Sequence, residues 1–303
     1  MFGKKLSKNA NAVVTGAGSG IGRAFALEIA KRGGRVVCAD IDLQRAQETV
    51  EMITALLEGD KPHPDLVYKP HAWAVQCDVS KLAQVQALAD TAEDCFEGSA
   101  ERTAINLVIN NAGIGIGGKP IGETPIEDWQ RTLGVNMWGV IHGCHVFAPR
   151  LKAAATQGRK GKRTNNQFGI VNVASTASFA AAPLMGPYNA SKAAALAVTE
   201  TLAAEVAGTG MKVTALCPTF VKTNIVRDGE IDNDSRKLAE KLMHWTGMAP
   251  EKVVIQTLNA LDSGELYVLP QMDARMIWRM KRLTPGTYAK GAGLLNRIAQ
   301  KAL

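Results

Sequence analysis

The chain has 303 residues, of which 46% are hydrophobic, enough for one large α/β domain or two small ones with a sizeable core. It contains no run of 18 apolar residues and no apolar signal core before residue 12, so neither a membrane-spanning helix nor a secreted protein is expected. The formal net charge is +7, but aromatic residues make up only 5%, which argues against nucleic-acid binding.

The five cysteines, at positions 38, 77, 95, 144 and 217, form no Cys-x-x-Cys pair. Three of them fall in predicted strands that should be buried, which favours reduced packing residues in a reducing compartment. The expected location is therefore the cytoplasm, or the inner face of a membrane.

A strand, a glycine-rich turn and a helix are predicted near the N-terminus. A β-branched stretch at 12–15 leads into three spaced glycines, and helical periodicity follows. In this context Gly16 permits a tight turn, Gly20 lets backbone N–H groups approach a pyrophosphate, and Gly22 lets the helix pack close to the strand. We expect the dinucleotide to contact Thr15, Gly16, Gly18, Ser19, Gly20, Ile21 and Gly22.

The next predicted strand, residues 35–40, ends on Asp40, 18 residues after Gly22, and is followed by Ile41. A carboxylate at this point accepts hydrogen bonds from the adenosine ribose and repels a 2′-phosphate. Neither Arg nor Lys lies in the glycine turn or directly after Asp40, and Arg45 is expected to face solvent. The sequence therefore predicts NAD(H), not NADP(H), as the cofactor.

A further strand is predicted at 169–174 and is followed directly by Ser175. An alanine-rich helix is predicted after it, with Tyr188 and Lys192 at its start. The spacing of four residues places the phenol and the ammonium on one helix face, about one turn apart. A fixed positive charge there favours the phenolate, so we expect a lowered tyrosine pKa and a base that works near neutral pH. By itself a Tyr-x-x-x-Lys pair is also compatible with a packed tyrosine and a solvated lysine.

With the glycine turn, Asp40, Ser175 and the Tyr-x-x-x-Lys pair in this order, the chain resembles the short-chain dehydrogenase/reductase family from about residue 10 to residue 270. The resemblance implies a single doubly wound Rossmann domain with a mostly parallel seven-stranded sheet. The alternation of strands and helices, without a Pro/Gly linker or an internal repeat, also favours one domain at 1–270. A basic extension at 271–303 follows it.

Further segments resemble motifs of that family, and the resemblance implies their roles. Asp78 and Val79 would border the adenine, Asn111, Ala112 and Gly113 would lie under the cofactor, and Pro218, Val221 and Thr223 would contact the nicotinamide carboxamide. Thr219 replaces the glycine that is usual in the last of these segments. The resemblance also implies the catalytic set Asn136, Ser175, Tyr188 and Lys192.

These residues predict an NAD-dependent alcohol dehydrogenase or ketone reductase. Tyr188 would exchange the hydroxyl proton, Ser175 would donate to the substrate oxygen, and Lys192 would hold the nicotinamide ribose. Asn136 would hold a water molecule that links Lys192 to solvent. Two alternatives are a non-catalytic cofactor-binding regulator and a sugar-nucleotide epimerase or dehydratase on a related fold. The intact catalytic set disfavours the first, and the glycine spacing disfavours the second.

The substrate pocket should be lined by residues 114–118, residues 179–185 and a lid at about 222–248. The first two stretches are apolar and mostly small, and the lid carries Leu242, Met243, Trp245 and Met248 near its end. Such walls suit a hydrophobic secondary alcohol or ketone, without selecting among steroids, terpenoids, aromatic or long-chain compounds.

Two loops are longer than the resemblance leads us to expect, at 59–65 and at 159–166, and both are predicted to be solvated surface loops, the second being basic. His142 and His145 are spaced as a metal pair could be, but no third ligand is evident, so we predict no metal. The resemblance implies a homodimer or homotetramer built on the helices that carry Asn136 and Tyr188.

The extension at 271–303 carries seven Lys/Arg and one acid, Asp273, and therefore a formal +6 of the chain's +7. Within a predicted helix at 273–283, the arginines form one row and the apolar residues the opposite stripe: Arg275, Arg279 and Arg282 against Met276, Ile277, Met280 and Leu283. The stripe should dock on the enzyme's own active-site mouth or on a neighbouring subunit. The alternative is peripheral contact with an anionic membrane.

Overall fold

The computed structural model describes residues 5–58, 71–97, 105–157, 167–223, 230–231 and 246–302. The loops at 59–65 and 159–166, and most of the predicted lid, including Leu242, Met243 and Trp245, lie outside these residues.

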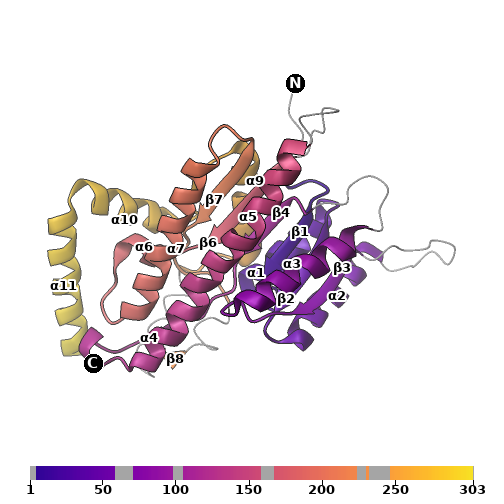
Figure 1. Ribbon diagram of the computed structural model, residues 1–303. Helices are drawn as coiled ribbons and strands as arrows, with labels where there is room; N and C mark the ends of the chain where they lie inside the picture. The colour runs from indigo at the N-terminus through magenta and orange to yellow at the C-terminus, as the bar shows by residue number, and fades with distance from the viewer. Residues whose placement is uncertain are drawn as a thin grey trace.

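A parallel seven-stranded sheet with the order β3-β2-β1-β4-β6-β7-β9 forms the centre of the molecule (Figure 1). Its strands are β1 (Asn11–Thr15), β2 (Arg35–Asp40), β3 (Ala72–Gln76), β4 (Leu107–Asn110), β6 (Phe168–Val173), β7 (Met211–Leu216) and β9 (Tyr267–Val268). Every pair in the sheet is parallel. A separate two-stranded ladder pairs β5 (Ile116–Gly117) with β8 (Glu230–Ile231). The predicted doubly wound fold with seven strands is therefore confirmed.

Helices cover both faces of the sheet. They are α1 (Gly20–Lys31), α2 (Leu43–Glu58), α3 (Leu82–Glu97), α4 (Ile126–Leu133), α5 (Gly139–Gln157), α6 (Ala177–Ala180), α7 (Gly186–Glu205), α9 (Pro250–Ser263), α10 (Met272–Leu283) and α11 (Pro285–Ala302). A 3-10 turn, η1 (Ile121–Glu123), precedes α4, and a π-helix, η2 (Gly134–Trp138), joins α4 to α5.

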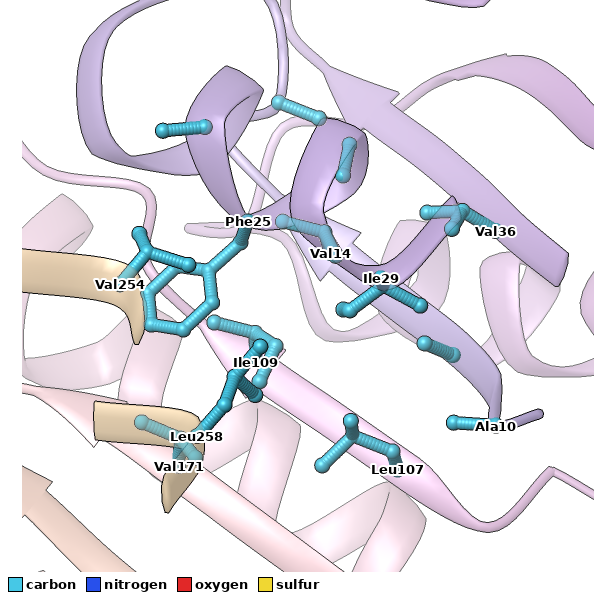
Figure 2. Packing of buried hydrophobic residues seen from close by; sticks show 14 of the residues in the cluster. Ala10, Val14, Phe25, Ile29, Val36, Leu107, Ile109, Val171, Val254 and Leu258 are labelled. Atoms are coloured by element: carbon cyan, nitrogen blue, oxygen red, sulfur yellow. The ribbon is translucent and has the colours of Figure 1, made fainter. Parts of the chain in front are cut away.

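Successive strand residues point to opposite faces, so each strand contributes to two cores. Figure 2 shows the first core, in which Phe25 and Ile29 of α1 meet Val254 and Leu258 of α9 over the strands. The second core lies under α3, α5 and α7 and includes Val13 on the opposite side of β1. Because burying one such side chain contributes about 1.5–3 kcal/mol, these layers fix the sheet that carries the site.

The strand order reverses beside β1. The chain runs from β1 outward through β2 to β3, and then returns to place β4 on the other side of β1. In open parallel sheets, the carboxyl ends of the strands at such a reversal border a crevice in which ligands bind. The turns after β1, β2, β4, β6 and β7 all leave this edge, and each carries predicted site residues.

The cysteines are all free, and four of them, Cys38, Cys77, Cys144 and Cys217, are buried, while Cys95 is half-buried. Burial raises the pKa of the Cys38 and Cys217 thiols to about 12. They therefore stay protonated near neutral pH and act as packing groups, as predicted. No helix within the described ranges is long and apolar enough to cross a bilayer.

The chain beyond β9 forms two helices where the sequence predicted one. In Figure 1, α10 and α11 make an arm at the end of the sheet that carries β7. α10 packs against α6, the short helix that follows Ser175. The docked side of α10 carries buried Ala274 and half-buried Ile277 and Trp278.

The predicted apolar stripe on α10 is therefore partly wrong. Ile277 belongs to the docked side, whereas Met272, Met276, Met280 and Leu283 are 78%, 57%, 44% and 79% exposed. Spacings of four, four and three residues place these four side chains along one helix face. These four side chains therefore do not dock on the enzyme's own surface, as the apolar stripe was expected to do.

Candidate active site

The glycine turn joins β1 to α1 and has no room for side chains where the motif has glycine. Gly16 and Gly20 have φ of +63° and +54°, a backbone region that favours glycine. A Cβ on Gly22 would lie 2.0 Å from the carbonyl oxygen of Gly16. Helix α1 starts after Ser19 with no side-chain cap and no acidic residue in its first turn. Its first N–H groups can thus serve an anionic group such as a pyrophosphate.

Two residues that the sequence analysis missed brace this turn. Arg23 donates to the carbonyl oxygen of Gly18 and to the Thr49 hydroxyl, and it forms an ion pair of 2.9 Å with Glu48. Thr49 donates to the carbonyl oxygen of Ala17 at 2.8 Å. These contacts join the turn to α2, which is why no pattern local to the turn revealed them.

Asp40 lies at the end of β2 and faces the glycine turn. Its Oδ2 accepts a hydrogen bond of 2.8 Å from the Gly18 amide, and its Oδ1 accepts one of 3.1 Å from the Asp42 amide. The side chain of Arg45 is 49% exposed, as expected, and its Nε lies 3.4 Å from Asp42 Oδ2. The carboxylate is thus held beside the turn, where the sequence placed a ribose-binding acid.

A cavity of about 520 Å³ adjoins this end of the sheet. It is lined by Ile41, Val75, Gln76, Asp78, Gln84, Ala87, Leu88 and Thr91. Two glutamines that the sequence analysis missed fix its walls. Gln84 Oε1 accepts from the Asp78 amide at 2.7 Å, and Gln76 Nε2 donates to the Ile41 carbonyl at 3.1 Å. Of the two residues expected to border an adenine, Asp78 lines this cavity and Val79 is buried outside it.

The segment after β4 connects the glycine turn to the catalytic residues. Asn111 Nδ2 donates to the carbonyl oxygens of Thr15 and Gly16, at 2.9 and 3.1 Å. Asn136 lies in the π-helix and is fully buried. Its Oδ1 accepts from the Ile114 amide at 2.8 Å. Its Nδ2 donates to the Ile114 carbonyl at 2.9 Å and to Ser191 Oγ at 3.1 Å. π turns occur often at functional sites.

Ser175, Tyr188 and Lys192 converge where β6 ends and α7 begins. Ser175 and Tyr188 share a side-chain hydrogen bond. Lys192 Nζ lies 5.9 Å from the centroid of the Tyr188 ring and donates to the Val173 carbonyl at 2.8 Å. Ser178 Oγ donates to the Lys192 carbonyl at 2.7 Å, which ties the segment after Ser175 to α7.

The electrostatics of the pair differ from the expectation. Burial raises the pKa of Tyr188 above its ordinary value, and the Ser175 hydrogen bond opposes that rise. Burial also lowers the pKa of Lys192 from 10.5 to about 8, although nearby Cys217 opposes this shift. The lowered tyrosine pKa predicted from spacing alone is therefore wrong for the polypeptide by itself, because burial disfavours the phenolate more than the Ser175 hydrogen bond favours it.

Residues 218–223 extend from the end of β7 to the glycine turn. The carbonyl of Pro218 accepts from the Thr176 amide at 2.9 Å, and Val221 is buried and bridged to Met248. A Cβ on Gly20 would lie 3.1 Å from Thr223 Cγ2, so Thr223 borders the turn. The segment therefore lies between the residues that follow Ser175 and the expected position of the pyrophosphate, and it includes Pro218, Val221 and Thr223.

The segments at 114–118 and 179–185, which were expected to line the substrate pocket, contact each other. The Gly118 amide donates to the Leu184 carbonyl at 2.7 Å, and Lys119 forms a β-bridge with Met185. Ala181 and Leu184 adopt positive φ, of 51° and 63°.

The histidine pair shows no metal-site geometry. His142 Nδ1 lies 2.9 Å from the Val79 carbonyl, and its ring packs on Trp138 at 5.6 Å between centroids. Among the residues that the structure covers, no three His, Cys, Asp or Glu side chains are grouped as metal ligands would be.

Comparisons with known proteins agree with this geometry. The family model described as short chain dehydrogenase matches residues 10–234. The chain is 32% identical over 290 residues to the probable oxidoreductase EphD of Mycobacterium tuberculosis, and this match covers 93% of the chain but only 44% of that longer protein. It is 31% identical to 1-deoxy-11-beta-hydroxypentalenate dehydrogenase of Streptomyces exfoliatus, with 90% of each chain covered.

A solved structure is similar over nearly its full length. A short chain dehydrogenase/reductase from Burkholderia phymatum, in complex with NAD, is 31% identical and superposes with a TM-score of 0.77. The match covers 92% of this chain and 95% of that one.

Proposed function

Since the chain belongs to the short-chain dehydrogenase family, we propose that it is an NAD(H)-dependent oxidoreductase that interconverts a hydrophobic secondary alcohol and its ketone. The observation that carries the proposal is the group formed by buried Ser175 and Lys192 with half-buried Tyr188, at the sheet edge that also holds the glycine turn.

Tyr188 is proposed as the acid/base. As phenolate it takes the hydroxyl proton of the alcohol, and as phenol it returns a proton to the oxygen of the ketone. Ser175 donates a hydrogen bond to the same oxygen, where negative charge develops. Lys192 holds the cofactor ribose, while Asn136 holds a water molecule beside Lys192. The nicotinamide ring, when bound, would accept the hydride or give it back.

The residues present fit NAD(H). The turn that would hold the pyrophosphate depends on glycine, because Gly16 and Gly20 adopt positive φ and a Cβ on Gly22 would lie 2.0 Å from the Gly16 carbonyl oxygen. Asp40 lies beside Gly18, where its charge would repel a 2′-phosphate and its oxygens would accept from ribose hydroxyls. The NAD bound to the Burkholderia relative supports the same choice.

A hydrophobic substrate is supported by the apolar walls at 114–118 and 179–185. It is also supported by the Streptomyces relative, whose name gives hydroxypentalenate as its substrate. We further propose a homodimer or homotetramer that uses the helices carrying Asn136 and Tyr188. Trp138, 48% exposed at the end of η2, is a large apolar side chain available to such an interface.

The direct test is NADH formation at 340 nm with a panel of hydrophobic secondary alcohols, with NAD and NADP in parallel. Turnover should require a hydrophobic alcohol, and NAD should be preferred over NADP by at least roughly tenfold in kcat/KM, the effect of about 1.4 kcal/mol. A preference for NADP would contradict the role of Asp40. A preference for small anionic hydroxy acids would contradict the proposed substrate class.

Peripheral contact with an anionic membrane is also proposed, through the outer face of α10. That face carries the exposed Met272, Met276, Met280 and Leu283. The exposed Arg275, Arg279 and Arg282 run along its border, where Arg275 also bonds the Leu269 carbonyl and Arg282 also packs on Trp278. An apolar stripe flanked by cations inserts into a headgroup region and attracts anionic lipids. Pairing two copies through this face would bring two arginine rows together, which opposes self-association.

Vesicle flotation tests this contact. The protein should float with phosphatidylserine-containing vesicles and stay behind with neutral phosphatidylcholine vesicles. Changing Met276, Met280 and Leu283 together to glutamine should weaken vesicle binding by at least roughly tenfold. Each substitution removes an apolar side chain that would otherwise be buried in the membrane interface. The matched control is glutamine at Leu43, Met52 and Ile255, exposed apolar residues elsewhere. Equal flotation of the two triple variants would refute the contact.

A further inference from the structure

Residues 218–223 form the segment that the proposed function assigns to the nicotinamide, and one of its residues departs from the family pattern. Thr219 stands where glycine is usual. Its side chain does not point to free space, because Thr219 Oγ1 donates to Asp273 Oδ1 at 3.0 Å. Asp273 lies in the first turn of α10, 54 residues further along the chain.

A second residue of the C-terminal extension holds the backbone of the same segment. Gln271 is only 6% exposed. Its Oε1 accepts from the Thr219 amide at 3.2 Å, and its Nε2 donates to the Phe220 carbonyl at 3.0 Å. Both ends of one buried amide are thus used on consecutive residues of the segment. A buried side chain with both ends paired restrains the backbone that it bonds.

The remaining contacts of the segment come from the Rossmann domain itself. Thr176 donates to the Pro218 carbonyl at 2.9 Å, and Met248 exchanges backbone hydrogen bonds of 3.0 Å with Phe220 and Lys222. Gln271 and Asp273 complete the support on the side of α10. They are held there in turn, because Tyr267 and Trp278 pack together and the Arg282 guanidinium lies 4.1 Å from the Trp278 ring.

We propose that Gln271 and Asp273 are positioning residues for the cofactor: together with Thr219 they clamp residues 218–223 in the conformation that receives the nicotinamide end. This inference rests on the proposed function, since it requires that the chain binds NAD(H). A segment ordered in advance loses less conformational entropy on binding, so the clamp strengthens binding of the nicotinamide end. The adenosine end would be held by other elements, the end of β2 and the cavity beside α3.

The variants Thr219→Val and Thr219→Ser distinguish the effect of the hydrogen bond to Asp273 from the effect of side-chain packing at position 219. Valine keeps the branched shape and loses the hydroxyl, whereas serine keeps the donor to Asp273. Calorimetry would measure the affinity of each variant for NADH and for ADP-ribose, which lacks the nicotinamide. Thr219→Val should bind NADH roughly tenfold more weakly, as expected for the loss of a hydrogen bond to a charged acceptor, and Thr219→Ser should remain within about twofold of wild type. Both should bind ADP-ribose as wild type does.

Gln271→Leu provides the second variant. It should weaken NADH binding by at least as much, because both of its backbone contacts are lost, and leave ADP-ribose binding unchanged. Equal losses for NADH and ADP-ribose would indicate a general structural effect and overturn the clamp. Unchanged NADH affinity in Thr219→Val and Gln271→Leu would overturn it as well, while the proposed function would stand. A wild-type protein that binds neither molecule would overturn both.

Discussion

Replacing Tyr188 with phenylalanine is expected to lower kcat/KM by on the order of a thousandfold, the range in which general acid–base groups act. In the proposed mechanism the phenol oxygen exchanges the substrate proton, and the Ser175 side chain is hydrogen-bonded to it. Phenylalanine keeps the ring next to Lys192, so NADH should still bind with a dissociation constant within about twofold of wild type. Steady-state kinetics and NADH titration measure the two effects separately.

Tyr288→Phe is the matched control, because it removes a phenol oxygen from α11, outside the site. It should leave both kcat/KM and NADH affinity unchanged. Retention of more than a few per cent of activity in Tyr188→Phe would mean that another group moves the proton. Loss of NADH binding in the same variant would mean that the tyrosine acts in cofactor binding, so the two failures can be told apart.

Local patterns in the sequence predicted the parts of the site that depend on neighbours in the chain. The glycine turn needs only a strand before it and a helix after it, and Asp40 only needs to end the next strand. Tyr188 and Lys192 share a face because one helix carries both. In each case the relevant distance is fixed by secondary structure, so spacing alone was informative.

What the sequence could not predict depends on residues brought together by folding. Gln84 Oε1 accepts a hydrogen bond of 2.7 Å from the backbone amide of Asp78. Gln271 Oε1 accepts one of 3.2 Å from the backbone amide of Thr219, 52 residues earlier in the chain. Neither glutamine has a pattern that marks its partner. The direction of the Tyr188 pKa was missed for the same reason, because the burial that raises it is a property of the packed structure and cannot be read from spacing.

The outer face of α10 illustrates a third limit. Helical periodicity grouped Ile277 with Met276, Met280 and Leu283, yet Ile277 lies on the docked side and Met272 replaces it on the exposed face. A broad apolar stripe does not reveal where the neighbouring α6 will contact it. The choice between docking and exposure is made residue by residue, by packing.

Replacing Lys192 with methionine is expected to change the pH dependence of stability as well as to remove activity. In the folded chain burial lowers the pKa of Lys192 to about 8, against an ordinary value of 10.5. Between these two pH values the unfolded chain carries more protons on this residue than the folded chain does. The contribution of Lys192 to the stability of the wild type therefore rises with pH across this window, by a total on the order of 3 kcal/mol. The buried thiols contribute in the opposite direction above about pH 9, but they do so equally in wild type and variant.

Methionine fills a similar volume and has no proton to exchange. The difference in unfolding free energy between wild type and Lys192→Met should therefore shift in favour of the wild type as pH rises from about 8 to 10.5, and stay constant below pH 8. Urea unfolding at several pH values measures it, with Lys31→Met as the baseline for replacing an exposed lysine. A difference that stays flat across the window would contradict the buried ammonium. A rising difference would mean that at neutral pH the fold carries the cost of a buried charge at Lys192, the residue that the proposed mechanism uses to hold the cofactor ribose.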